Sequence, residues 1–294
     1  MCGIVGLYLK DEALKPQLGW LLSDMLVTMS DRGPDSAGIA IYSEAPAGRA
    51  KITVQSDEIE SSFAALEYAF EDNARITRRD SHAVLEVAVD DVAKIKAEIE
   101  KNHPAVRIMS TGETVEIYKE VGLPADVIDR FEVRQMAGSH GVGHTRMATE
   151  SAVTTLGAHP FSTDDDQCLV HNGSLSNHNR LRQKLQQEGV TFETENDTEV
   201  GAAYFADKMR KGASLDEALE AGITDLDGFY TFVCGTKGGF AVLRDPIACK
   251  PAVLAETDQY VAFGSEYRAL VNLPGIENAR VWEPEPATVY AWGA

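Results

Sequence analysis

The sequence has few cysteines, fewer basic than acidic side chains and no long hydrophobic run. Its four cysteines show neither close pairing nor CxxC spacing, which argues against a metal site or a disulfide framework. The formal charge of −19, from 27 basic and 46 acidic side chains, repels the phosphates of nucleic acids and anionic lipids. We therefore expect a chain that binds neither nucleic acid nor membranes and that carries no metal or cofactor of its own.

The hydrophobic residues are spread along the chain. No segment approaches the roughly 18 apolar residues of a membrane span, and no basic segment followed by an apolar run opens the sequence. The expected location is the cytoplasm. With 294 residues, 44% of them hydrophobic, the chain can form one large core or two ordinary domains. We expect the three internal cysteines, Cys168, Cys234 and Cys249, to be core residues.

Cys2 directly follows the initiator methionine. Because Cys is small, processing is expected to remove Met1 and leave a first residue that carries both a thiol and a free α-amine. A thiol with a pKa near ~8.5 is mostly protonated at neutral pH, whereas an α-amine near ~7.7–8.0 is a usable base there. Cys2 is therefore a candidate nucleophile that supplies its own base, as N-terminal Thr nucleophiles do.

Several short motifs follow Cys2. Along the chain they are Arg32-Gly33-Pro34-Asp35, Gly143-His144-Thr145-Arg146, His171-Asn172-Gly173, Asn196-Asp197-Thr198-Glu199, Arg244-Asp245-Pro246 and Gly264-Ser265-Glu266. In this order they resemble the class II glutamine amidotransferases, N-terminal-nucleophile enzymes that release ammonia from glutamine. The resemblance covers nearly the whole chain except a middle segment. It implies an α+β fold, the four-layer αββα sandwich of N-terminal-nucleophile hydrolases with mostly antiparallel sheets.

The hydrophobic pattern agrees with a strand-rich domain. Alternation predicts a strand at residues 3–9 that places Cys2 at a sheet end, and helical spacing predicts a helix from Leu18 that ends before Arg32. Later strands surround helices at 177–187 and 198–210, and residues 235–239 read as a hairpin loop. We expect one amidotransferase domain over residues 2–294.

Residues 48–136 depart from the short glutaminase pattern. Here the sequence predicts helices at 59–70 and 91–101, a strand at 82–89 and strands near 107–109 and 115–118. This βαββ character indicates a small inserted subdomain within the amidotransferase domain. Its histidines, His82 and His103, lack partner motifs and are assigned no chemistry.

The resemblance assigns catalytic roles to Cys2, Asn172 and Gly173. In the family, an Asn side-chain amide and a Gly backbone N–H form the oxyanion hole that faces the charge developing on the amide carbonyl. Taken alone, Asn-Gly is the strongest hairpin-turn dipeptide, but its place after His171 favours the catalytic interpretation.

Glutamine also has to be held by its α-carboxylate and α-ammonium groups. A guanidinium binds carboxylates in a bidentate way, so Arg146 suits the first, with a surface salt bridge as the alternative. Asp197 suits the ammonium, and it also stands where a helix N-cap belongs, two roles that are compatible. Thr149 matches the family's pocket threonine. Met147 and Glu150 depart from the usual aromatic and His, so the lid of the pocket is expected to differ.

The family motifs end near residue 270, and only a strand-like tail follows. Since no ammonia-consuming domain fits there, the chain looks most similar to free-standing amidotransferase subunits of glutamate synthase or N-methylglutamate synthase-like systems. This similarity implies L-glutamine as substrate and a separate synthase subunit, with flavin and iron–sulfur centres carried by that partner. Two alternatives stay open: an amidohydrolase of another amide, and a non-catalytic regulatory subunit that retains the fold.

Overall fold

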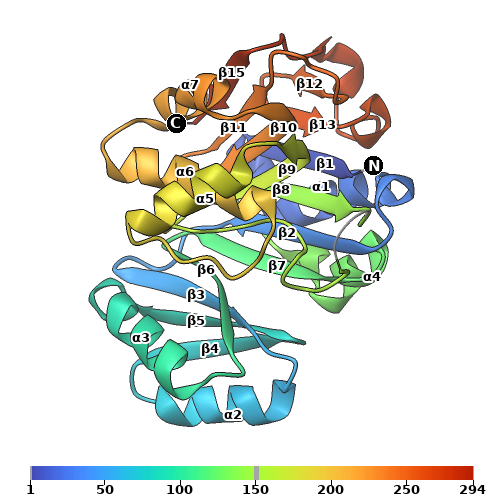
Figure 1. Cartoon of the computed structure of the whole chain (residues 1–294). Helices are drawn as coiled ribbons and strands as arrows, with labels where there is room; N and C mark the ends of the chain where they lie inside the picture. Colours follow the sequence, from blue (N-terminus) through green and yellow to red (C-terminus); the bar gives the residue numbers. More distant parts are fainter. Residues whose placement is uncertain (1, 149–151, 294) are drawn as a thin grey trace.

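The computed structural model describes residues 2–148 and 152–293, which form two facing antiparallel sheets with a third sheet beside them (Figure 1). The larger sheet has seven strands, in the spatial order β14 (Arg280–Trp282), β12 (Val253–Glu256), β13 (Tyr260–Gly264), β1 (Gly3–Leu9), β8 (His140–Arg146), β2 (Ser36–Tyr42) and β7 (Val115–Val121). The facing sheet has four, in the order β15 (Thr288–Trp292), β11 (Phe240–Arg244), β10 (Gly228–Gly235) and β9 (Cys168–Leu175).

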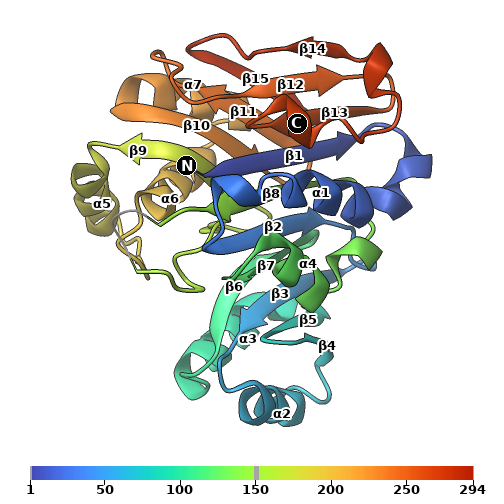
Figure 2. The same cartoon turned by 90° about the vertical axis from the view of Figure 1, so that its right-hand side faces the viewer.

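Helices cover the outer faces of these two sheets. Figure 2 shows α1 (Leu18–Val27) and α4 (Pro124–Arg130) in front of the seven-stranded sheet. The four-stranded sheet packs against α5 (His178–Gln187), α6 (Asp197–Arg210) and α7 (Leu215–Asp225). A separate apolar cluster fills the space between the sheets. The structure thus confirms the predicted four-layer αββα sandwich.

Strand β1 shows how the sequence produces this layering. Because successive side chains of a strand point to opposite faces, Val5 and Leu7 pack with the helix-side core, whereas Ile4 packs in the core between the sheets. Gly6 also faces the second sheet, where an added Cβ would lie 3.6 Å from Val233. Both faces of β1 are therefore buried, and the strand holds the start of the chain at the centre of the sheet.

The third sheet lies in the inserted segment, with the order β4 (Ala74–Arg79), β5 (His82–Ala88), β3 (Arg49–Gln55) and β6 (Arg107–Gly112). Helices α2 (Ile59–Ala69) and α3 (Val92–Asn102) pack on it around their own apolar cluster. Along the chain this gives β-α-β-β-α-β, a ferredoxin-like arrangement in which all neighbouring strands are antiparallel. Sequence analysis missed β3 and β4.

The predicted boundaries of 48–136 extend past this sheet. Strand β7 pairs with β2 along seven residues of the main sheet, and α4 packs on the main helix-side core. The separate sheet itself spans residues 49–112. Six short 3-10 helices complete the described elements: η1 (Glu12–Gln17), η2 (Ser30–Arg32), η3 (Val89–Asp91), η4 (Val133–Gln135), η5 (Tyr267–Ala269) and η6 (Ile276–Asn278).

Other predictions can be checked locally. The hairpin at 235–239 joins β10 to β11, with the Thr236 N–H donating to the Gly239 carbonyl at 2.8 Å. Cys168 and Cys234 are buried as expected, but Cys249 is exposed, so its prediction as a core residue was wrong. Cys249 lies in the loop between β11 of the four-stranded sheet and β12 of the seven-stranded sheet.

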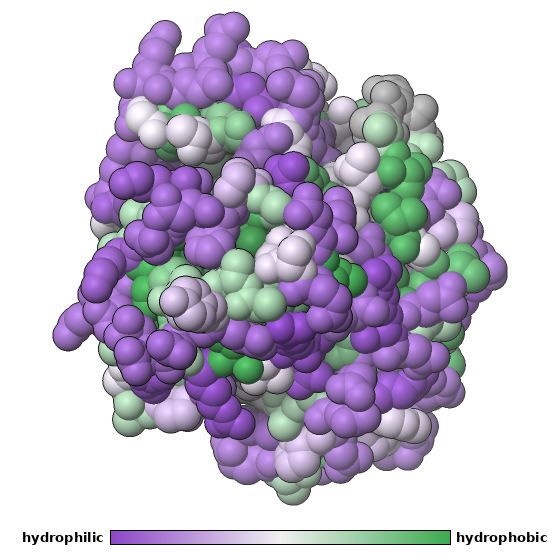
Figure 3. All heavy atoms as spheres, turned by 90° about the horizontal axis from the view of Figure 1, so that it is seen from below, coloured by the Kyte–Doolittle hydropathy of each residue, from purple (hydrophilic) through white to green (hydrophobic). Residues whose placement is uncertain are grey.

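The surface agrees with the acidic composition. Hydrophilic residues cover most of the face seen from below, and hydrophobic ones occur in smaller groups between them (Figure 3). Within residues 2–148 and 152–293, none of the helices has the length and apolar character needed to cross a membrane.

Candidate active site

Cys2 lies at the start of β1, where the surrounding chain fixes its backbone. Its carbonyl accepts hydrogen bonds from Arg32 Nε at 2.9 Å and from Asn172 Nδ2 at 3.1 Å. Arg32 in turn pairs with the carboxylate of Glu266, which follows β13. Further along the strand, Ile4 and Ser265 exchange two hydrogen bonds of 2.9 Å. The Ile4 N–H donates to Ser265 Oγ, and the Ser265 N–H donates to the Ile4 carbonyl. The thiol of Cys2 is free and half-buried.

The Asn-Gly pair lies within β9, next to Cys2. Asn172 is 3% exposed, and its register partner is Thr231 of β10. Gly173 has φ +146°, and a Cβ there would lie 2.0 Å from the Phe229 carbonyl oxygen, so only glycine fits. These residues are therefore part of a strand, and the alternative interpretation as a hairpin turn was wrong.

Arg146 ends β8, the strand beside β1. The last register pair between these strands joins Gly3 to Thr145, so Cys2 and Arg146 both lie one residue beyond it. Arg146 is 6% exposed and its Nη1 donates to the Ala152 carbonyl at 3.3 Å, which excludes a simple surface position. Its backbone is tied to Asp35 of the Arg-Gly-Pro-Asp turn, since Asp35 N donates to the Arg146 carbonyl at 3.1 Å.

Asp197 is the first residue of α6, and the N-cap is Asn196, whose side chain accepts from Thr198 N at 2.9 Å. The expectation that Asp197 itself caps the helix was therefore wrong. One carboxylate oxygen of Asp197 accepts from Leu175 N at 2.9 Å, and the other lies 3.7 Å from His171 Nδ1. Burial alone would raise the pKa of Asp197, but His171 and the Leu175 N–H lower it to about 2. The carboxylate is ionised at neutral pH.

Buried histidines connect these elements behind the site. His144 Nε2 lies 3.0 Å from the His171 carbonyl, and since a carbonyl only accepts, this nitrogen carries the proton. The Thr198 hydroxyl lies 2.7 Å from His159 Nε2 and 3.1 Å from His171 Nδ1. Burial lowers the pKa of His144 to about 3 and that of His159 well below its usual value, so both rings are neutral. This network links β8, β9 and α6.

The structure thus brings Cys2, Arg146 and Asp197, at the ends of β1, β8 and α6, near Asn172 and Gly173 within β9. Thr149 and Glu150 lie outside the described residues, and Met147 is 37% exposed.

Sequence reasoning missed the residues that hold this site. Arg32, Ser265 and Glu266 occur in the quoted motifs, but their contacts join separate parts of the sequence. Arg32 binds Cys2, Ser265 binds Ile4 and Glu266 binds Arg32. Thr198 follows Asp197 directly, and only the fold places it between two histidines. Within the part of the chain that the structure describes, no group of three or more His, Cys, Asp or Glu side chains could hold a metal ion.

The arrangement suits acyl transfer from an amide. The Cys2 thiol lies at a sheet end beside the neutral side-chain amide of Asn172. The nitrogen of this amide carries two hydrogens, so its bond to the Cys2 carbonyl leaves one N–H for a bound oxyanion. A buried guanidinium and an ionised carboxylate flank these groups on neighbouring elements. Such a pair can hold the two charges of an α-amino acid.

Comparisons with known proteins agree with this chemistry. A family model described as "Glutamine amidotransferase domain" matches residues 144–272. The "Glutamine amidotransferase-like protein GlxB" of Rhizobium meliloti (strain 1021) is 66% identical over 99% of this chain and 98% of its own. A "Putative glutamine amidotransferase" of Methanothermobacter thermautotrophicus is 33% identical over 99% of both chains.

A solved structure supports the fold. The glutamine phosphoribosylpyrophosphate amidotransferase from B. subtilis, complexed with ADP and GMP, superposes with a TM-score of 0.62 at 20% identity. The match covers 99% of this chain but 47% of that enzyme, so the chain spans about half of its length.

Proposed function

Because the chain belongs to the class II glutamine amidotransferases, we propose that it hydrolyses L-glutamine to glutamate and ammonia through a thioester on Cys2. The observation that carries this proposal is the hydrogen bond from Asn172 Nδ2 to the Cys2 carbonyl, 3.1 Å long between residues 170 positions apart. It holds the candidate nucleophile and the candidate oxyanion donor side by side before any substrate binds.

In the proposed reaction, removal of Met1 exposes the α-amine of Cys2. This amine takes the thiol proton while sulfur attacks the side-chain carbonyl carbon of glutamine. The oxyanion receives hydrogen bonds from Asn172 Nδ2 and the Gly173 N–H. As the tetrahedral intermediate collapses, the carbon–nitrogen bond breaks and the amine returns its proton to the leaving ammonia. Water then attacks the thioester carbon, and glutamate leaves with regeneration of the thiol.

Substrate capture is assigned to Arg146 and Asp197. The Arg146 guanidinium binds the α-carboxylate of glutamine, and the Asp197 carboxylate binds the α-ammonium. Asp197 is suited to this role because its low pKa keeps it charged, and its contact with Leu175 N fixes one oxygen. Thr149 is proposed as a further pocket residue by its match to the family. The chain itself is proposed to need no cofactor.

The acceptor of ammonia is proposed to be a separate synthase subunit of the glutamate synthase or N-methylglutamate synthase-like type. Free ammonia becomes ammonium in neutral water and loses its nucleophilicity, so an uncoupled glutaminase would waste glutamine. We expect low basal activity that rises when a partner with flavin and iron–sulfur centres binds and acts on a 2-oxo acid. A cytoplasmic setting, which keeps thiols reduced, suits a free Cys2.

The direct test measures glutamate and ammonia formed from glutamine by the purified chain, with Cys2→Ala and Cys249→Ala in parallel. Cys249 is exposed and lies outside the proposed site, so its variant is the matched control. We expect Cys2→Ala to abolish turnover and Cys249→Ala to preserve it. Rapid turnover of some other amide, with glutamine ignored, would contradict the proposal.

The partner is tested by adding the purified synthase subunit to the glutaminase assay and following complex formation by light scattering. Stimulation together with complex formation supports the subunit role. Full activity of the lone chain, unchanged by that subunit, would contradict it.

A further inference from the structure

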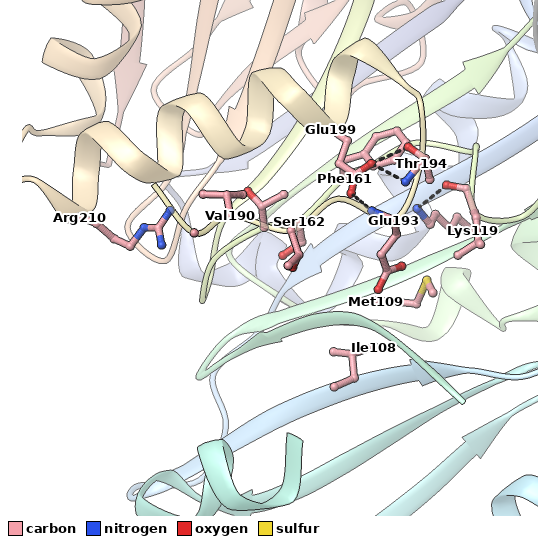
Figure 4. Close-up of a pocket in the computed structure, with 14 residues that line it drawn as sticks. Ile108, Met109, Lys119, Phe161, Ser162, Val190, Glu193, Thr194, Glu199 and Arg210 are labelled. Atoms are coloured by element: carbon pink, nitrogen blue, oxygen red, sulfur yellow. Dashed lines mark hydrogen bonds between the residues drawn. The ribbon is translucent and has the colours of Figure 1, made fainter. Parts of the chain in front are cut away.

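A cavity apart from the candidate active site lies where the inserted subdomain meets the main sandwich. Its volume is about 310 Å³, and the proposed catalytic residues do not line it. Ile108 and Met109 of β6 form one wall, and Lys119 of β7 with residues 161–163 forms another (Figure 4). The remaining wall comes from residues 189–191, 193 and 194 and from Glu199 and Arg210 of α6. The cavity therefore lies between the inserted sheet and the segment that leads to Asp197.

Two buried charges of this cavity are already used by the protein. Lys119 Nζ donates to the carbonyls of Leu156, Ala158 and Pro160 at 3.3, 2.9 and 3.2 Å, which uses all three of its hydrogens. The carboxylate of Glu199 accepts from Glu193 N, Thr194 N and Thr194 Oγ1 at 2.6–2.8 Å. Both groups therefore build the walls and stabilise two loops.

Two other charges line the cavity from exposed residues at its rim, Glu193 and Arg210. Figure 4 shows the Glu193 carboxylate pointing into it near Met109, and Arg210 at the opposite end beside Val190. Glu193 is exposed, and among the described residues none donates a hydrogen bond to its carboxylate. Partial desolvation and the neighbouring Glu199 raise the pKa of Glu193, whereas Arg107 and Lys119 act in the opposite direction. Arg210 has one ion pair, from Nε to Asp164 at 3.3 Å, and its guanidinium has further donors. Ile108, Met109 and Val190 supply apolar surface between the two ends.

We propose that this cavity binds a small zwitterionic amino acid whose ammonium group pairs with Glu193 and whose carboxylate pairs with Arg210. The opposite charges at the two ends select a ligand with separated charges, and the apolar side chains of Ile108, Met109 and Val190 suit a short methylene chain between them. Neither a simple anion nor a simple cation satisfies both ends.

The ligand acts on glutamine capture through residues 193–197, a step that rests on the proposed role of Asp197. Glu199 of α6 binds the backbone N–H groups of residues 193 and 194, and Arg182 of α5 donates to the Thr194 carbonyl at 2.7 Å. Asn196 then caps α6 directly before Asp197. A ligand that pulls on Glu193 thus acts on a hydrogen-bonded segment only four residues from Asp197.

Binding is tested by calorimetric titration with 5-aminopentanoate, pentanoate and n-pentylammonium, which share a carbon chain and differ in charge. We expect 5-aminopentanoate to bind at least about 10-fold more tightly than either single-charge probe. Glu193→Gln and Arg210→Gln should each weaken it by about 10-fold, since each removes one charge-assisted contact at a partly exposed site. Glu195→Gln, an exposed position of the same segment outside the cavity, is the matched control and should bind normally.

Coupling is tested by measuring the KM for glutamine with and without saturating 5-aminopentanoate. A change of about 5-fold or more, absent in Glu193→Gln, is expected for a typical coupling between two sites. Arg146→Ala should lose glutamine capture yet still bind 5-aminopentanoate, which distinguishes this cavity from the active site. Equal binding of all three probes, loss of binding in Arg146→Ala, or an unchanged KM at saturation would overturn the proposal. Because calorimetry needs no turnover, the binding result stands or falls independently of glutaminase activity.

Discussion

The carbonyl of Cys2, where β1 meets β9, accepts hydrogen bonds from the side chains of Arg32 and Asn172. By contrast, the Glu193 carboxylate, at the cavity beside β6, accepts no hydrogen bond from the described residues. The first region is held rigidly from several directions in the absence of substrate. The second keeps its walls rigid, through Lys119 and Glu199, but leaves two charges at its ends. A catalytic site benefits from groups fixed in advance of the transition state, and a ligand-responsive site needs groups whose partner is the ligand.

The largest effect is expected from Asn172→Ala, which tests the rigid side of this comparison. Loss of the oxyanion donor should lower kcat for glutamine hydrolysis by roughly 10²–10³-fold with a smaller change in KM, because the donor is most needed in the transition state. Asn102→Ala, at the exposed end of α3 in the inserted subdomain, is the control and should leave kcat unchanged. A variant of Asn172 with normal kcat would remove this residue from the mechanism.

Arg32→Ala should lower kcat by roughly 10²-fold, since the Arg32 Nε bond to the Cys2 carbonyl fixes the nucleophile and small misplacements are costly. Arg32 touches no reacting atom in this account and is a positioning residue. Arg134→Ala, at an exposed position of η4, serves as the control. Melting temperatures of both variants separate loss of positioning from loss of folding, and an unchanged kcat in folded Arg32→Ala would contradict the positioning role.

Asp197→Asn should raise the KM for glutamine by roughly 10–100-fold with a smaller effect on kcat, because a charge-assisted bond to the α-ammonium is lost. Asp216→Asn, in the first turn of α7, is the control for a helix-terminal carboxylate.

The pKa of Asp197 predicts how stability and the KM for glutamine depend on pH. The pKa of Asp197 is about 2 when folded, so its contribution to stability is fully present above the unfolded value near 3.9 and is lost as pH falls toward 2. Between pH 7 and 5 the KM should therefore show no change due to Asp197. An acidic limb in that range that disappears in Asp197→Asn would contradict this assignment.

The smallest effect concerns a buried histidine of the inserted subdomain. Burial, chiefly, lowers the pKa of His82 to about 3, so below about pH 6.5 the unfolded chain binds a proton that the folded chain does not. Stability is then lost as pH falls from 6.5 toward 3. In urea unfolding at pH 7 and pH 5, His82→Phe should lose less stability than the wild type over this interval. Equal losses in both proteins would show that His82 does not contribute.

Sequence reasoning succeeded where a short stretch contains the whole signal. The alternating pattern of β1, the apolar stripe of α1 and the hairpin at 235–239 were all predicted from local residues. The His-Asn-Gly stretch could be assigned a position in the site because its residue types and order carry the resemblance. α7 was missed although Ser214 and Glu217 form a capping box, a signal that was present in the sequence.

Other features depend on pairing between distant residues. The sequence of β7 does not show that it pairs with β2 and so belongs to the main sheet, nor that β3 lies between β5 and β6. The Arg32 and Glu266 pair joins residues 234 positions apart, and the cavity beside β6 is lined by residues from 108 to 210. These features follow from tertiary packing, which a single sequence with short motifs does not determine.

The central claim is that Cys2, as the first residue of the mature chain, is the nucleophile. It is tested most directly by treating the purified protein with a glutamine-like diazo-ketone and locating the modification by intact-mass and peptide mass spectrometry. The account predicts one adduct per chain, on an N-terminal Cys2 from which Met1 has been removed, and none on Cys168, Cys234 or Cys249. Adduct formation on another residue, or Met1 retained on fully active protein, would contradict it.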